Sequence, residues 1–409
     1  MNDTFRYIIA GLLIFLIIIL QPLYLEWLGY GAGDSEPPNK ENDSLSSAYI
    51  KEEEAFNNDV YKKVPVVFPK ESFITVSTPL YTATVSNRSG GSFKNYVLTD
   101  NAFGSFKYIG GYDGGGSFFS KLPVSIIMPS AEGCMPCLAY YNDRSDNYHF
   151  INNPFTLINF MSMPVNDTIY LGSDESIELK YVLLDESGIS LIKKSVFFFG
   201  DKYLSKHFYE INDNDFKLPG NPEIVWYGGL RPTEEHVDED LQYASGLISQ
   251  VGEIDDIQIK KTEPLVSREV YKGRTEWAGV RTKYFLSALI DDNLGEYAVL
   301  SAENVVFGDH KQIPLYNAGI GYAKGTSAIS SKIYLGPLDV DHIASSGANL
   351  DAAMNWGFSL IRPISKGVLW VLKFIHNTFH LNYGLVLLLF AFLVRLVTGP
   401  LTKKSYESS

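Results

Sequence analysis

Long apolar runs occur near both ends of the chain and predict two membrane-spanning helices. Residues 7–20 read YIIAGLLIFLIIIL without a charge, and apolar residues continue to Leu28. Residues 381–401 read LNYGLVLLLFAFLVRLVTGPL. Both segments are long enough, because a spanning helix needs about 20 mostly apolar residues. We expect residues 1–30 to be an uncleaved anchor rather than a signal peptide, since no A-x-A cleavage site follows the apolar run.

Between these two runs, the pattern predicts a polar linker and then a large β-domain. Residues 31–63 are polar and acidic, which is typical of a flexible linker. In residues 64–346, short apolar and β-branched runs alternate with Gly, Asn, Asp and Ser turns. Many strands with few helices predict a mainly β fold, a large antiparallel sandwich. Strands are expected within residues 73–87, 177–184, 196–200, 277–290 and 297–308, with turns at 87–91 and 110–116.

Residues 347–380 have the period of an amphipathic helix. The basic residues Arg362, Lys366 and Lys373 recur near helical spacing between apolar residues, and Trp370 falls on the same polar stripe. Pro363 is expected to break or kink the helix near its start. Basic residues, a tryptophan and a neighbouring span favour a helix lying in the membrane interface. The alternative is a helix packed on the β-domain.

Arg395 lies deep in the second apolar run. A cation at mid-depth costs at least about 2.5–3.5 kcal/mol, so it either snorkels from a helix end or faces a wet cavity. Lys403 and Lys404 follow this span and Arg6 precedes the first. Positive flanking residues favour the cytoplasm, which predicts cytoplasmic termini and a periplasmic β-domain.

Composition and motifs exclude several functions. The chain has 409 residues and a net charge of -13, which disfavours nucleic-acid binding because phosphates attract basic surfaces. Its two cysteines, Cys134 and Cys137, have no helical pattern beside them, so a thioredoxin-like role is not expected. A local disulfide and two incidental thiols both remain possible. No metal-binding or nucleotide-binding motif is present, and no cofactor is predicted.

Several motifs together resemble the YidC-type membrane-protein insertase family (YidC/Oxa/Alb). Residues 392–406, FLVRLVTGPLTKKSY, resemble its first core transmembrane helix, including Arg395 and the run Pro400, Leu401, Thr402 and Lys403. Other stretches resemble its external domain, and the resemblance covers nearly the whole chain. These stretches are residues 74–91, 226–248, 273–290 and 332–339.

The resemblance implies a fold and a function. The external domain is expected to be a β-supersandwich of the galactose-mutarotase type. The family inserts and chaperones integral proteins of the bacterial inner membrane, with or without the Sec translocon, and is not enzymatic. Its hydrophilic groove contains a positive Arg, here matched by Arg395. Implied partners are nascent membrane proteins, the Sec translocon, the ribosome and the lipid bilayer, with a multi-pass topology.

The family pattern continues beyond residues 402–409, the expected start of a cytoplasmic region, with further core spans. The chain is therefore expected to be an incomplete N-terminal part. A second hypothesis is a membrane-tethered carbohydrate-binding or mutarotase-like domain, and a third is a structural tether or Sec-docking module. The second needs an acid–base pair in a cleft. Its candidate residues are His149, His207, His236, His310, Glu234 and Glu235.

Overall fold

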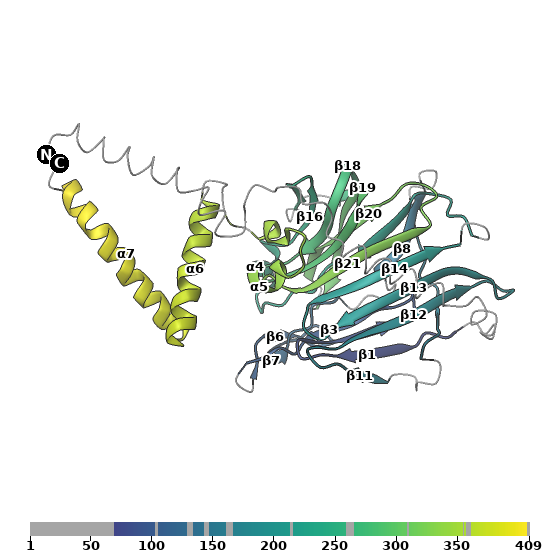
Figure 1. Ribbon diagram of the computed structural model, residues 1–409, viewed down its shortest axis with the longest axis horizontal. Coiled ribbons are helices and arrows are strands. Elements are labelled where there is room, and N and C mark those ends of the chain that lie inside the picture. The colour runs from purple at the N-terminus through teal and green to yellow at the C-terminus, as the bar shows by residue number, and fades with distance from the viewer. Residues whose placement is uncertain are drawn as a thin grey trace. The chain divides into compact units, whose positions relative to one another are not determined.

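The computed structural model describes residues 69–406, except 103–104, 129–133, 143–146, 161–166, 213–215, 259–265, 309–310, 355 and 357–360. The predicted anchor (1–30) and linker (31–63) lie outside the described residues. The described chain is mainly β and ends in helices (Figure 1). The predicted class, a mainly β fold with large antiparallel sheets, is confirmed.

The larger sheet contains 13 strands, and its neighbouring strands are antiparallel. These strands are β8 (Cys134–Asn142), β9 (Asn147–Phe150), β10 (Thr156–Leu157), β12 (Ser176–Leu184), β13 (Ser190–Phe199), β14 (Leu204–Ile211), β15 (Pro222–Tyr227), β16 (Ser245–Gln250), β17 (Glu253–Ile257), β18 (Val266–Arg281), β19 (Phe285–Phe307), β20 (Lys311–Gly321) and β21 (Ala328–Pro337). Their order is β10-β12-β13-β14-β21-β19-β20-β15-β8-β9, and β18 joins β16 and β17 to β19.

The smaller sheet packs its apolar face on the larger one. It contains β11, β1, β2 and β3 in that order, with β11 parallel to β1. Phe93 of β3 contacts Phe198 of β13, with ring centroids 6.0 Å apart, within one shared core. In β12, Leu179 and Tyr181 are buried, as the alternation of this segment predicts. The small-sheet strands are β1 (Phe73–Ser77), β2 (Tyr81–Ser86), β3 (Ser92–Leu98) and β11 (Thr168–Tyr170).

The predicted turn at residues 87–91 joins β2 to β3. Gly90 and Gly91 have φ angles of 62° and 95°, which favour glycine. A Cβ atom on Gly91 would lie 3.1 Å from the ring of Tyr181. The Asn87 side-chain amide donates to the backbone oxygens of Lys70 and Phe155. The turn is confirmed, and it lets the backbone approach the larger sheet closely.

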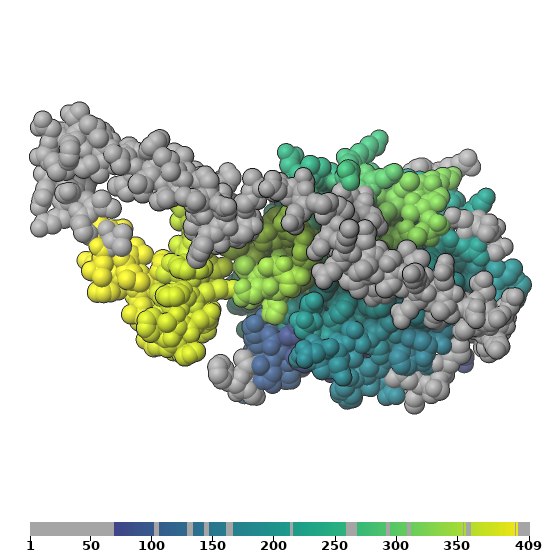
Figure 2. Space-filling view, in the orientation of Figure 1, coloured from purple at the N-terminus to yellow at the C-terminus, as the bar shows by residue number. Residues whose placement is uncertain are grey.

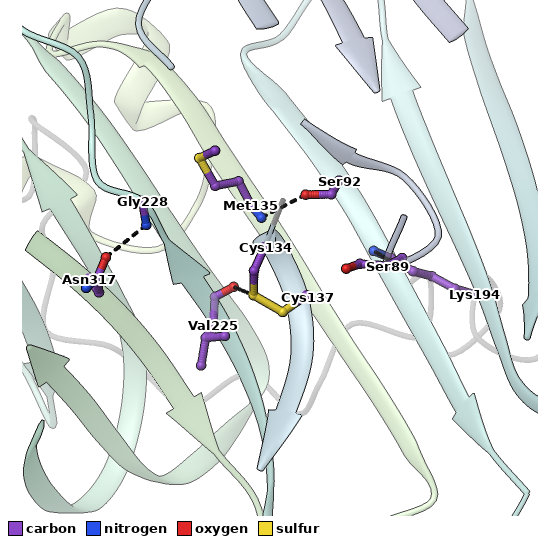
Figure 3. The surroundings of a disulfide bond; sticks show 9 residues. All are labelled: Ser89, Ser92, Cys134, Met135, Cys137, Lys194, Val225, Gly228 and Asn317. Carbon is purple, nitrogen blue, oxygen red and sulfur yellow. Dashed lines mark hydrogen bonds between the residues drawn. A yellow bond between two sulfur atoms is a disulfide. The ribbon is translucent and has the colours of Figure 1, made fainter. Parts of the chain in front are cut away.

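The two cysteines form a disulfide at the start of β8 (Figure 3). Cys134 and Cys137 are 1% and 0% exposed, so the bond is buried in the domain. Between them, the Met135 N–H donates to Ser92 Oγ of the smaller sheet at 2.8 Å. Of the two states that the sequence leaves open, the structure contains the disulfide, and it lies at a point where the two sheets are hydrogen-bonded.

Short hairpins and helices lie at one end of the sheets (Figure 1). The hairpins pair β4 (Asn101–Ala102) with β5 (Ser105–Phe106) and β6 (Ile109–Tyr112) with β7 (Phe118–Pro123). The helical elements are α4 (Val237–Leu241), α5 (Val340–Ala344), the 3-10 helix η1 (Leu350–Ala353), α6 (Arg362–Phe379) and α7 (Tyr383–Tyr406).

The predicted helix at residues 347–380 starts later than expected, because α6 begins at Arg362. Gly347 and Asn349 have left-handed φ angles of 75° and 50°, which are incompatible with a continuous right-handed helix. Pro363 lies in the first turn of α6, where its missing N–H is tolerated. Pro363 therefore marks the beginning of the helix rather than a kink within it.

Candidate membrane-interaction site

The polar stripe of α6 contacts the β-domain through two ion pairs. Lys366 Nζ lies 2.7 Å from Asp351 Oδ2 of η1, and Lys373 Nζ lies 2.7 Å from Asp341 Oδ2 of α5. Lys366 also lies over the ring of Trp356, 5.6 Å from its centroid. Each of these pairs is partly exposed, so each contributes at most about 1 kcal/mol. The two ion pairs thus restrain the orientation of α6, but they add little to the free energy of unfolding.

Three large apolar side chains of α6 are exposed, and Trp370 lies one turn from Lys366 on the same stripe. Ile364, Trp370 and Phe374 are 64%, 51% and 53% exposed. Trp370 and Phe374 lie one turn apart, and their rings stack with centroids 5.6 Å apart. Arg362, at the start of the helix, is also exposed. With its lysines bound to the domain, α6 therefore presents aromatic side chains to its surroundings.

A tight connection joins α6 to α7. His380 takes a left-handed φ of 52° and ends α6, and the Asn382 side chain then accepts a hydrogen bond from the Leu385 N–H at 3.0 Å. His376 stacks on Tyr383 with ring centroids 4.3 Å apart, and its Nδ1 lies 2.6 Å from the Leu381 oxygen. These contacts fix the first turn of α7 against the end of α6.

Helix α7 is apolar on all of its described faces except at Arg395. Leu388 and Leu393 are 69% and 45% exposed although they lie on different sides of the helix. Arg395 is exposed among them. Over the residues that the structure describes, no helix combines the length and the apolar character needed to cross a membrane. The side chains of Pro400, Leu401, Thr402 and Lys403 lie outside the described residues.

The candidate acid–base residues of the carbohydrate hypothesis lie in separate settings. His149 is exposed and stacks on Tyr140, whereas His207 is fully buried and contacts Ser205 Oγ at 3.0 Å. Burial lowers the pKa of His207 well below its usual value, and nearby Lys194 lowers it further.

His236 is the residue before α4, and Glu234 lies 3.2 Å from Lys283 Nζ. Glu235, the residue between them, accepts through its backbone oxygen from the Tyr112 hydroxyl. His310 lies outside the described residues. Among the described residues, no three His, Cys, Asp or Glu side chains are arranged to hold a metal ion.

Two buried ionisable side chains could not be predicted from the sequence. Glu223 is 0% exposed and accepts hydrogen bonds from the hydroxyls of Tyr148 and Tyr297 and from Arg268. Lys194 is 1% exposed, donates to the Ser89 oxygen at 2.8 Å and lies over the Tyr209 ring. Their hydrogen-bond partners are 45 to 105 residues away, so local patterns cannot reveal them.

The described chain is thus a β-domain followed by an amphipathic helix and an apolar helix. The profile of the YidC periplasmic domain matches residues 166–371, half of the chain, and the chain belongs to this family.

Relatives support the same family over most of the chain. Membrane protein insertase YidC of Chlorobaculum tepidum is 28% identical over 349 residues, which cover 83% of this chain and 54% of the relative. That of Pelodictyon phaeoclathratiforme is 25% identical over 418 residues, which cover 96% of this chain and 65% of the relative. The chain spans about half the length of most of these curated relatives.

Solved structures with a similar arrangement of strands include two proteins of carbohydrate metabolism. A putative aldose 1-epimerase from Escherichia coli K12 is 11% identical, with a TM-score of 0.34, over 66% of this chain and 99% of that one. The α-N-acetylgalactosaminidase NagBb from Bifidobacterium bifidum is 8% identical, with a TM-score of 0.33, over 64% of this chain and 38% of that one.

Proposed function

We propose that this chain forms the periplasmic domain, the interfacial helix and the first core transmembrane helix of a membrane-protein insertase and chaperone of the bacterial inner membrane. The observation that carries the proposal is the exposure of aromatic side chains on α6 beside its ion-paired lysines. Lys366 and Lys373 bind acids of η1 and α5, and Trp370 and Phe374 are half exposed on the neighbouring stripe. Basic residues next to exposed aromatic rings are typical of a helix at the membrane interface, where tryptophan lies at the headgroup level.

The ion pairs also connect α6 to the β-domain. Because Asp341 and Asp351 bind the two lysines, this flank of α6 lies in water beside the domain. Trp370 and Phe374 are exposed on the neighbouring stripe and lie among the headgroups, where tryptophan is favoured. Helix α7 follows directly and enters the bilayer, so the membrane covers the apolar side chains that the described chain leaves exposed.

Arg395 gives the membrane segment its proposed role. A cation in an otherwise apolar helix is costly unless water or polar groups reach it. A hydrophilic groove beside Arg395 shortens the hydrocarbon path for polar parts of an incoming chain and attracts its acidic residues. Partition of the substrate's apolar helix into lipid then drives release. Nascent inner-membrane proteins are the substrates, and the ribosome and the Sec translocon are the partners that deliver them.

A crosslinking experiment tests this role on two faces of α7. Leu388 precedes Arg395 by about two helical turns and shares its face, whereas Leu393 lies on the other side of the helix. A photoreactive amino acid is placed at position 388 or 393 of the protein expressed from its own gene. A ribosome-stalled nascent inner-membrane protein is then trapped by illumination.

We expect adducts at position 388 and few at position 393. Arg395→Glu should remove the adduct at 388, because it would repel acidic segments, and Arg395→Lys should retain it. Equal adducts at both positions, or none at 388, would contradict a substrate groove beside Arg395.

A further inference from the structure

Four exposed side chains with apolar or aromatic surface gather at the end of the β-domain that carries α5. Phe106, Ile109, Phe119 and Tyr284 are 40%, 56%, 51% and 45% exposed. They come from β5, from the β6–β7 hairpin and from the β18–β19 turn. We call these four residues the hairpin rim. Single exposed apolar residues are common, but a group from three segments indicates an interaction surface.

The pairing of β6 and β7 explains why part of the rim faces outward. Phe118 contacts Tyr112 with ring centroids 5.4 Å apart, and Tyr112 in turn contacts Phe307 at 4.9 Å. Because side chains alternate along a strand, Phe119 points to the face opposite Phe118. Lys121 shares that outer face and is exposed. The hairpin therefore packs Phe118 against the domain on one face and exposes Phe119 on the other.

Direct contacts connect the rim to the point where the chain leaves the β-domain. Tyr108, beside Ile109, contacts Phe285 with ring centroids 6.2 Å apart, and Phe285 also contacts Tyr284. The Leu338 N–H donates to the Tyr284 oxygen at 2.7 Å, and Asp339 then caps α5. The hairpin, shown in blue in Figure 2, and α5 lie at the same end of the domain (Figures 1 and 2).

We propose that the hairpin rim is a second membrane contact, which enters the headgroup region of the bilayer on which α6 lies. This inference rests on the proposed function. Two observations favour a bilayer as the occupant. Asp341 of α5 is ion-paired to Lys373 of α6, so the rim lies near the interfacial helix along the chain's own contacts. The rim also combines Phe and Ile with Tyr, and aromatic side chains of this kind favour the headgroup level.

The charges near the rim have both signs. Lys121 shares its outer face, whereas Asp238 and Glu239 lie in the first turn of α4 at the same end of the domain. Neither sign dominates, so the rim suits a surface of zwitterionic phospholipid. Together, α6 and the rim would support the domain at two places and fix its tilt above the membrane.

Fluorescent probes in the full chain test the rim. Both native cysteines are joined in the disulfide, so single introduced cysteines can be labelled with an environment-sensitive dye. The positions are Phe119→Cys on the rim, Phe374→Cys on α6 and Ile189→Cys as the matched control. Ile189 is 41% exposed and precedes β13, whose other end leads to Tyr203 beside α5. Ile189 therefore lies at the far end of the domain.

The protein is reconstituted into phosphatidylcholine vesicles that contain headgroup spin labels. We expect quenching of the probes at 119 and 374 to exceed quenching at 189 by roughly twofold or more, as for side chains at the headgroup level. A probe at Ile109 should lose this quenching when Phe119→Asp is added, because the rim then carries a charge.

The outcomes separate the two proposals. Quenching at 374 without quenching at 119 would overturn the rim and leave the proposed placement of α6 intact. Equal, weak quenching at all three positions would overturn both. If emission at 119 changed with protein concentration instead of with spin-labelled lipid, the rim would be a contact between copies of the chain, and the bilayer proposal would fail.

Discussion

The tryptophans of the β-domain and of the C-terminal helices differ in exposure. Trp226 and Trp277 of the β-domain are fully buried, whereas Trp370 of α6 is half exposed. The domain supplies its own apolar neighbours from two sheets. Helices α6 and α7 leave Phe374 and Leu388 exposed. The domain therefore completes its core with its own residues. The exposed apolar side chains of the helices need apolar surroundings that the described chain does not supply.

Polar groups follow the same division. Glu223 in the β-domain is surrounded by hydroxyl and guanidinium donors from other strands. Lys366 and Lys373 of α6 obtain their partners from the domain rather than from their own helix. The domain therefore satisfies its interior and also provides the polar partners of the α6 lysines.

A matched pair of phenylalanines gives the largest expected contrast. Phe198→Ala should lower the free energy of unfolding by about 3–5 kcal/mol, because it opens a cavity in the shared core. Phe374→Ala should change it by less than about 0.5 kcal/mol in detergent, because the side chain is exposed. Urea titrations followed by tryptophan fluorescence measure both values. Similar losses at the two positions would remove the distinction between the regions.

Removing the buried carboxylate should cost nearly as much. Glu223→Gln keeps the size and can still accept from one of the two tyrosine hydroxyls, but it leaves the partly buried Arg268 without its counter-charge. We expect a loss of about 3 kcal/mol, measured by the same titration. The double variant Glu223→Gln with Arg268→Met should recover part of this loss. If the single variant unfolds like the natural protein, the interior does not depend on this ion pair.

Local sequence patterns predict the elements of the β-domain because side-chain alternation and turn glycines are local properties. The β12 alternation and the Gly90–Gly91 turn were accessible in this way. The start of α6 was not, because the left-handed Asn349 carries no fixed sequence signal. Side-chain contacts between distant residues could not be predicted either, since Asp341 lies 32 residues from Lys373 in the sequence. The family motifs indicated Arg395, but not what surrounds it.

Lys194 is the test case within the domain, because its buried amine donates to the Ser89 oxygen and lies over the Tyr209 ring. Burial lowers its pKa well below the usual 10.5. Below pH 10.5 the Lys194 amine is protonated in the unfolded chain but not in the folded chain. The free energy of unfolding of the natural protein therefore decreases as pH falls. The Lys194→Met variant lacks this amine, so its stability has no such dependence on pH.

The stability of Lys194→Met relative to the natural protein should therefore increase from pH 10 to pH 7. The slope can reach about 1.4 kcal/mol per pH unit. Urea titrations at each pH measure it. The lowered pKa of His207 acts in a separate window, because stability that depends on neutral His207 is lost only as pH falls through its unfolded value of about 6.5. A pH-independent difference would show that Lys194 stays charged when folded.

The ion pairs of α6 should have the smallest effect on stability and yet decide its orientation. Asp351→Asn should lower the free energy of unfolding by less than about 1 kcal/mol, because Asp351 and Lys366 are partly exposed. A double-mutant cycle with Lys366→Met isolates the coupling, expected at about 0.5 kcal/mol. If this coupling is found and Asp341→Asn with Asp351→Asn increases the mobility of a spin label at position 377, the ion pairs restrain α6. A rigid label in that double variant would show that the apolar connection to α7 holds α6 by itself.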